Sequence, residues 1–232
     1  MVPFPFAGDE WLLDRAGALY WPREQALLVA DLHLEKASFF ASHGQPLPPY
    51  DSRETLARLA EAIRACGARR VFCLGDSFHD ERGPQRIEQH AAGMLDALTR
   101  AVDWVWITGN HDATLPAGIG GTVVDEAQLG AVVLRHRARP GEVAGEVSGH
   151  YHPRLQLVHR GRRIRRACAV TGERRMILPA FGALTGGMNA ADPAIVAALQ
   201  PARAINAVVR AGGRAARLPL WRAEPCEATG RS

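Results

Sequence analysis

The sequence predicts a single α/β domain built in layers, and three observations point to it. Apolar runs alternate with segments of helical periodicity, which is the pattern of a sheet covered by helices. Short polar motifs follow the apolar runs directly, where open α/β sheets place their functional groups. The length of 232 residues is enough for one large domain with a substantial core and does not require two.

The N-terminal segment is predicted to form a hairpin. Two apolar stretches, 11–13 and 18–21, are separated by the turn-like sequence Asp14-Arg15-Ala16-Gly17. The next run, 26–30, is apolar throughout, as expected of a strand that is buried on both faces. Further strand-like runs occupy residues 70–74, 104–108, 131–134 and 145–148.

Two helices are expected, one between the runs 26–30 and 70–74 and the other between the runs 70–74 and 104–108. The first covers residues 51–66, with a capping-box-like start at Asp51 and Glu54 and a stop at Gly67. Its apolar face would carry Leu56, Leu59, Ala60 and Ile63. The second helix is expected to start at Pro84. Its inward face would carry Ile87, Ala91, Met94, Leu95 and Leu98.

The pattern changes after residue 150. Runs at 155–159 and 164–170 flank Arg160-Gly161 and predict a β-hairpin. We interpret this part of the chain as a second sheet, of antiparallel strands, that packs on the first. The domain is expected to extend over residues 1–222, and the small polar residues 223–232 predict a disordered tail.

Composition narrows the class of protein. A hydrophobic content of 47% and a charged content of 22% are those of a soluble globular protein. No apolar run approaches the roughly 20 residues that cross a bilayer, and the N-terminus lacks the basic and apolar regions of a signal peptide. The four cysteines show no paired spacing, which favours reduced thiols. We therefore expect a cytoplasmic protein without membrane contact.

The chain is modestly basic, with a net charge of +4, and 27 of its 28 basic side chains are arginine. Many of these arginines fall between residues 135 and 175. Arginine binds phosphate through two parallel hydrogen bonds, so the cluster could contact a nucleic acid. An arginine-rich composition would also produce a solvated cluster without a function, and both interpretations stay open.

Five polar motifs at the ends of apolar runs supply metal-ligating side chains. They are Asp31-Leu32-His33, Gly75-Asp76, Gly109-Asn110-His111-Asp112, His136 and Gly149-His150-Tyr151-His152. Oxygen and imidazole ligands suit Mn²⁺, Fe or Zn²⁺, and the absence of cysteine from the motifs argues against a zinc knuckle or an iron–sulfur cluster. Two cations about 3.5–4 Å apart are the usual device for displacement at phosphorus. The set therefore predicts hydrolysis of a phosphate ester.

Each motif alone has a simpler explanation. Gly75-Asp76 is ordinary turn chemistry, Asp31 and His33 could mark the end of a strand, and a lone residue such as His136 is more often a surface histidine than a ligand. The joint order of the motifs and their placement at strand ends make the metal site the better interpretation.

In this order the motifs resemble the calcineurin-like metallophosphoesterase superfamily over residues 26–152. The resemblance implies a metallophosphoesterase-type fold, in which two β-sheets form a sandwich flanked by helices (αββα). It also implies two divalent metal ions, with Mn²⁺ as first choice and Fe or Zn²⁺ as alternatives. Phosphodiester bonds would then be hydrolysed by a hydroxide that bridges the metals.

The resemblance also assigns roles to individual residues. One metal would be held by Asp31, His33, Asp76 and His152. Asp76 would bridge to the second metal, which would be completed by Asn110, His136 and His150. His111 would lie over the substrate phosphate as a charge stabiliser or a general acid. The residues themselves suggest His79 and Asp112 as groups that orient the imidazole of His111 or contact substrate, although His79 could equally be an exposed loop residue.

Further motifs resemble the PdeM-type group of ligase-associated DNA damage-response endonucleases. They include Asp31-Leu32-His33-Leu34-Glu35-Lys36, Gly44-Gln45-Pro46-Leu47-Pro48, Gly75-Asp76-Ser77-Phe78-His79-Asp80, Leu178-Pro179-Ala180-Phe181-Gly182 and Thr185-Gly186-Gly187. This resemblance implies a DNA substrate, a link to DNA repair and a functional association with a DNA ligase and a helicase.

Two other functions fit the same residues. A phosphodiesterase or phosphatase for a nucleotide or another small metabolite would use the same site. A binding scaffold that has lost catalysis would keep the same fold, but the complete ligand set and His111 argue against it. The chain has no Gly-x-Ser-x-Gly elbow and no Walker-type loop, which favours direct attack without a covalent enzyme intermediate.

Overall fold

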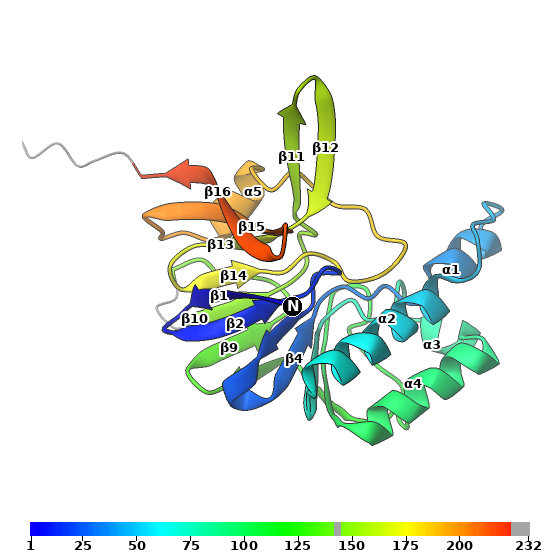
Figure 1. The fold of residues 1–232 in the computed structure, drawn as a ribbon. Coiled ribbons are helices and arrows are strands. Elements are labelled where there is room, and N and C mark those ends of the chain that lie inside the picture. Colours follow the sequence, from blue (N-terminus) through cyan, green and yellow to red (C-terminus); the bar gives the residue numbers. More distant parts are fainter. Residues whose placement is uncertain (142–144, 224–232) are drawn as a thin grey trace, which may run out of the picture.

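The computed structural model describes residues 1–141 and 145–223, and its centre is a pair of seven-stranded sheets (Figure 1). The first sheet has the order β1 (Val2–Phe6), β2 (Asp9–Leu13), β3 (Leu19–Trp21), β4 (Ala26–Val29), β5 (Arg70–Leu74), β6 (Asp103–Ile107) and β7 (Thr122–Val124). The second has the order β16 (Arg214–Arg222), β15 (Ala204–Ala211), β13 (Ala169–Thr171), β14 (Arg175–Ile177), β10 (Gly145–Ser148), β9 (Val132–Arg135) and β8 (Glu126–Leu129). Apart from Ala223, the predicted tail 223–232 lies outside the described residues.

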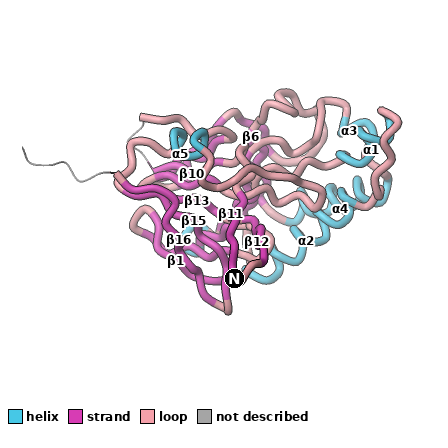
Figure 2. Tube along the Cα trace, turned by 90° about the horizontal axis from the view of Figure 1, so that it is seen from above, coloured by secondary structure: helices cyan, strands magenta, loops and turns pink. Residues whose placement is uncertain are grey.

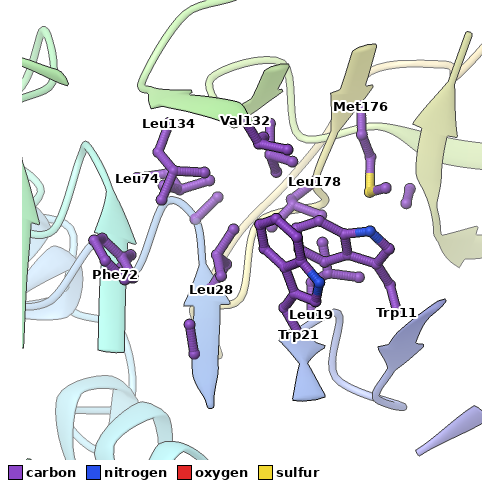
Figure 3. Packing of buried hydrophobic residues seen from close by; sticks show 14 of the residues in the cluster. Trp11, Leu19, Trp21, Leu28, Phe72, Leu74, Val132, Leu134, Met176 and Leu178 are labelled. Atoms are coloured by element: carbon purple, nitrogen blue, oxygen red, sulfur yellow. The ribbon is translucent and has the colours of Figure 1, made fainter. Parts of the chain in front are cut away.

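The two sheets enclose the main hydrophobic core. Figure 3 shows Leu28 and Phe72 of the first sheet beneath Leu134 of the second. The indole rings of Trp11 and Trp21 stack at a centroid distance of 4.2 Å inside this layer. Burying such large apolar side chains between two sheets supplies most of the driving force for the sandwich.

Helices cover the outer faces of both sheets. The first sheet is covered by α2 (Asp51–Cys66) and α4 (Gln89–Ala101), beside the short helices α1 (Lys36–Ser42) and α3 (Gly83–Arg86). The second is covered by α5 (Pro193–Ala198), and one further turn, η1 (Pro22–Glu24), joins β3 to β4. Figure 2 shows α5 on the opposite side of the molecule from α1–α4. The αββα sandwich is thus confirmed, and none of the described helices is long and apolar enough to span a membrane.

Two predictions about helix starts are wrong. The first helix does span residues 51–66 and ends at Gly67 with φ +68°, but no side chain caps its start. Instead, the carboxylate of Asp51 accepts the backbone N–H of Ala37 at 3.1 Å. The segment from Pro84 divides into α3 and α4, because the Glu88 carboxylate accepts the N–H groups of His90 and Ala91 and starts a new helix.

The second sheet also differs from the prediction. It contains β9 and β10, which precede residue 150, and it is mixed, since β10 lies parallel to both β9 and β14. The predicted hairpin forms as β11 (Arg154–His159) and β12 (Arg162–Ala167), but it is a separate two-stranded sheet that stands out from the sandwich (Figure 1). Its β12 strand is mostly exposed and arginine-rich, whereas Leu155 and Leu157 of β11 pack in the core cluster beside α5.

Candidate metal centre

The polar motifs converge where parallel strands of both sheets end. Asp31, Asp76 and Asn110 follow β4, β5 and β6, which are parallel neighbours in the first sheet. His136 and His150 follow β9 and β10, which are parallel neighbours in the second. Gly75, with φ +77°, lets the two sheets meet here, because a Cβ at that position would collide with the imidazole of His136.

A first cluster of candidate ligands consists of Asp31, His33 and His152, whose donor atoms all lie within 4.8 Å of one another. The Nε2 atoms of His33 and His152 are 3.2 Å apart. The Nε2 of His152 lies 3.5 Å from Oδ1 of Asp31. Asp31 is fully buried, and its carboxylate is further held by the backbone N–H of His150.

A second cluster consists of Asp76, His136 and His150, again with donor atoms within 4.8 Å of one another. The Nδ1 of His150 lies 3.1 Å from the Nε2 of His136. The side-chain oxygen of Asn110 lies 3.0 Å from the same Nε2, which adds Asn110 to this cluster. All seven predicted ligands are therefore brought together.

The carboxylate of Asp76 lies between the two clusters. Its Oδ1 is 3.5 Å from the Nε2 of His136 in the second cluster. Its Oδ2 is 3.9 Å from the Nε2 of His33 in the first. One oxygen therefore faces each cluster, which is the arrangement that a bridging ligand requires.

The atoms around His136 fit a cation. The Nδ1 of this ring is 3.0 Å from the backbone carbonyl oxygen of Leu74, so it carries the proton. In the neutral ring Nε2 then carries a lone pair and no proton. This lone pair faces the side-chain oxygen of Asn110 and the carboxylate of Asp76, which are also hydrogen-bond acceptors. Three lone pairs directed at one point repel each other unless a cation lies between them, so the donor set fits a divalent metal.

Burial favours the neutral form of His33 and His150, which is the form that binds a metal. It lowers the pKa of His33 to about 2, with smaller contributions from His152 and His111. Burial also lowers the pKa of His150, followed by the effect of His136. Imidazoles that do not hold a proton at neutral pH need no deprotonation before they ligate a cation.

The backbone of the candidate ligands is strained. Among the described residues, a positive φ occurs at nine non-glycine positions, and five of them are Asp31, His33, Asp76, His150 and His152. Each such residue costs of order 1–3 kcal/mol and persists only where the surrounding structure enforces it. The fold therefore imposes the turns that point these side chains inward.

His111 lies beside both clusters and is the most accessible histidine of the site. Its side chain is 42% exposed, and its Nε2 is 3.9 Å from Oδ2 of Asp76. The ring is oriented by a contact of 2.9 Å between its Nδ1 and the backbone carbonyl oxygen of His79. The imidazole of His79 lies nearly parallel to it, at 17° and a centroid distance of 5.5 Å. Burial lowers the pKa of His79 to about 4, with Lys36 adding to the shift.

Asp112 does not contact the imidazole of His111 in the way expected from the sequence. Its buried carboxylate accepts the backbone N–H groups of Ser77, Phe78 and Gly109 at 2.6, 3.1 and 3.1 Å. Burial raises the pKa of Asp112 to about 6. The residue therefore joins the two loops that carry Asp76 and Asn110, and it orients His111 only through the backbone.

A loop that the sequence analysis did not assign to the site supports the first ligand cluster. It spans residues 181–189 and follows β14. A Cβ at Gly182 would collide with the carbonyl of Leu32, between two ligands, and a Cβ at Gly187 would collide with the carbonyl oxygen of His152. Gly182 and Gly187, which belong to two motifs cited for the PdeM-type resemblance, thus have a structural reason that no periodicity could have revealed.

Comparison with known proteins agrees with this geometry. The family model described as calcineurin-like phosphoesterase matches residues 25–167. The solved structure of the nuclease MPE from Pseudomonas putida has 32% sequence identity and a TM-score of 0.71, and the alignment covers 93% of this chain and 98% of that one. No curated protein matches the chain.

Two further solved structures are much more distant. Yfce, a phosphoesterase from E. coli, has 15% identity over 84% of this chain and 98% of that one, with a TM-score of 0.42. The protein of unknown function AQ665 from Aquifex aeolicus has 13% identity over 55% and 78%, with a TM-score of 0.39. Neither similarity is close enough to support a conclusion about the site.

Proposed function

The chain belongs to the calcineurin-like phosphoesterase family, and we propose that it is a two-metal nuclease that hydrolyses phosphodiester bonds of DNA. The observation that carries the proposal is the position of Asp76, whose carboxylate oxygens face two clusters of histidine and carboxylate ligands. In this proposal Asp31, His33, Asp76 and His152 hold one cation. Asp76, Asn110, His136 and His150 hold the other.

Divalent cations at these positions would supply a water of lowered pKa and would neutralise charge on the phosphoryl oxygens, and Mn²⁺ would suit the oxygen and imidazole donors. The protein's own contribution is to fix the ligands. The shared carboxylate of Asp76 offsets the repulsion between two nearby dications, and the carbonyl of Leu74 fixes the tautomer of His136.

His111 is proposed to stabilise charge on the phosphate and to protonate the leaving oxygen. In the imidazolium form both ring nitrogens are donors. Nδ1 donates to the carbonyl of His79, which leaves the Nε2 proton for the substrate. Because the side chain is partly exposed at the edge of the site, a phosphodiester can reach it without a movement of the main chain.

The proposal that the substrate is DNA goes beyond phosphodiester hydrolysis and has its own support. It is supported by the similarity to a protein described as a nuclease over nearly the full length of both chains. It is also supported by the exposure of Asn110 and His111, since a site open to solvent suits a polymer. The arginine-rich hairpin, which starts two residues after His152, offers a basic surface for a phosphate backbone.

An activity panel with Mn²⁺ tests the proposal. It compares single-stranded DNA, duplex DNA, RNA, cyclic nucleotides and aryl phosphodiesters at equal enzyme concentration. We expect cleavage of DNA together with the aryl phosphodiesters. Hydrolysis of cyclic nucleotides or aryl esters without any cleavage of DNA would instead identify a small-molecule phosphodiesterase.

A further inference from the structure

Helix α1, which no periodicity predicted, carries two phenylalanines whose rings contact His79, the neighbour of the proposed catalytic histidine. It begins three residues after the ligand His33 and lies on the same side of the molecule as α2, α3 and α4 (Figures 1 and 2). Phe39 and Phe40 are both partly exposed. Among the described residues, neither belongs to any of the three hydrophobic core clusters, so their burial is not what holds the sandwich together.

The two phenylalanines continue a series of rings that starts at His111. His79 lies nearly parallel to His111, and Phe40 lies nearly parallel to His79, at 24° and a centroid distance of 5.8 Å. Phe39 meets His79 edge-on at 4.8 Å and lies 4.4 Å from the exposed ring of His43. Near-parallel rings whose centroids are more than 5 Å apart are offset sideways, so His111, His79 and Phe40 form a stepped surface and not a closed column.

We propose that this aromatic shelf, defined by Phe39, Phe40 and His79, is a stacking subsite for a nucleobase next to the scissile phosphate. The inference rests on the proposed function and narrows it, because it requires a substrate strand whose bases are unpaired at the site. The shelf is continuous with His111, so a nucleotide whose phosphate lies over the metal ligands places a neighbouring base within its reach.

The chemistry of the shelf favours a base over other occupants. Aromatic rings give each base a partner for its π-face and no pattern of hydrogen bonds to read, so binding depends little on sequence. A phosphate or a sugar would find no matched donor on Phe39 or Phe40. An aliphatic ligand would gain the apolar contact but none of the stacking geometry that the parallel rings of His79 and Phe40 offer.

The test uses single-stranded oligonucleotides in which one abasic position is moved past the cleavage site. With wild-type enzyme, one position should lower kcat/KM by about 5- to 150-fold, the range of base–aromatic stacking. Phe40→Leu, which keeps an apolar side chain, should show a loss of similar size on the intact strand and no further loss on that abasic substrate. Tyr50 is an aromatic residue that is 62% exposed and lies outside the shelf, so Tyr50→Leu should have the same kcat/KM as the wild-type enzyme.

Each alternative result has a definite meaning. Wild-type enzyme that cleaves every abasic strand as fast as the intact one would overturn the subsite without using any variant. An equal loss on intact and abasic strands in Phe40→Leu would show that the ring supports His111 and binds no base. An equal loss in Tyr50→Leu would show that the effect is not particular to the shelf. Cleavage of aryl phosphodiesters with no cleavage of any oligonucleotide would contradict the proposed nuclease itself.

Discussion

The carboxylate of Asp76 accepts the backbone N–H of His111 through Oδ1 at 3.0 Å. A single side chain thus lies between the two ligand clusters and also anchors the residue that we propose to act on the leaving oxygen. Asp76 therefore connects the candidate metal ligands to the position of His111. Variants of Asp76 and His111 should separate the effect on metal content from the effect on kcat.

We expect Asp76→Ala to lose both metal ions, because each cluster loses one oxygen ligand and the charge that offsets repulsion between the cations. Wild-type protein reconstituted with Mn²⁺ should approach two ions per chain by elemental analysis. Asp96→Ala on the exposed face of α4 serves as the control and should keep both. Retention of one ion in Asp76→Ala would contradict the bridging position.

His111→Ala should keep the metal content and lower kcat by roughly 10²–10⁴-fold, the usual range for a group that transfers a proton in the transition state. The reason is that the imidazole faces the site with its Nε2 while its Nδ1 is held by the carbonyl of His79. The exposed His90 of α4 provides the matched substitution, and His90→Ala should not change kcat. If His111→Ala lost metal, the side chain would have to be counted among the ligands.

Gly187→Ala should weaken metal binding at the first cluster by about 10–100-fold, the usual effect of disturbing the groups that support a ligand. A Cβ at Gly187 would collide with the carbonyl oxygen of His152 and contact the side chain of Arg154, so the loop and the ligand must separate. Gly186→Ala is the control, because a Cβ at Gly186 meets no atom within 4 Å. The affinity of both variants for Mn²⁺ can be measured from the rise of their thermal denaturation temperature as Mn²⁺ is added. Equal affinities would show that the loop does not position His152.

The convergence of the candidate ligands was easier to predict from the sequence than the arrangement of the sheets around them. β4, β5 and β6 are apolar runs that end in polar residues, and the ends of parallel strands meet wherever such strands are neighbours. β10 pairs with β14, which comes from later in the chain, and such pairing between separate segments leaves no local signal in the sequence.

Two further features could not be predicted for local reasons. Helix α1 has only seven residues, and it is stabilised by the side chain of Asp51 on the N–H of Ala37, from a distant part of the sequence. The positive φ of ligands such as Asp31 and His33 opposes the preference of the residues themselves. The surrounding fold imposes this conformation, so it becomes visible only in the structure.

The hairpin of β11 and β12 gives the last prediction, which concerns how a nucleic acid would be held. The strand register places Arg163 and Arg165 opposite Val158 and Gln156 on one face. Arg162 and Arg166 lie on the other face with Leu155 and Leu157, which contact the core cluster beside α5. The guanidinium of Arg165 donates to the carbonyl of Gly187, so the first face borders the loop that supports His152.

If the hairpin follows a phosphate backbone, DNA affinity should fall with salt at a log–log slope near −0.7 to −0.9 per neutralised phosphate. Replacing Arg162, Arg163, Arg165 and Arg166 by Ala should flatten this slope and leave hydrolysis of an aryl phosphodiester unchanged. Two double variants then separate the contributions of the two hairpin faces to this slope. Arg163→Ala with Arg165→Ala should account for most of the change, because that face borders the loop beside the metal ligands, while Arg162→Ala with Arg166→Ala should change it less. A salt slope that stays the same in the fourfold variant would mean that these arginines are only solvated, and the DNA would then have to be held elsewhere.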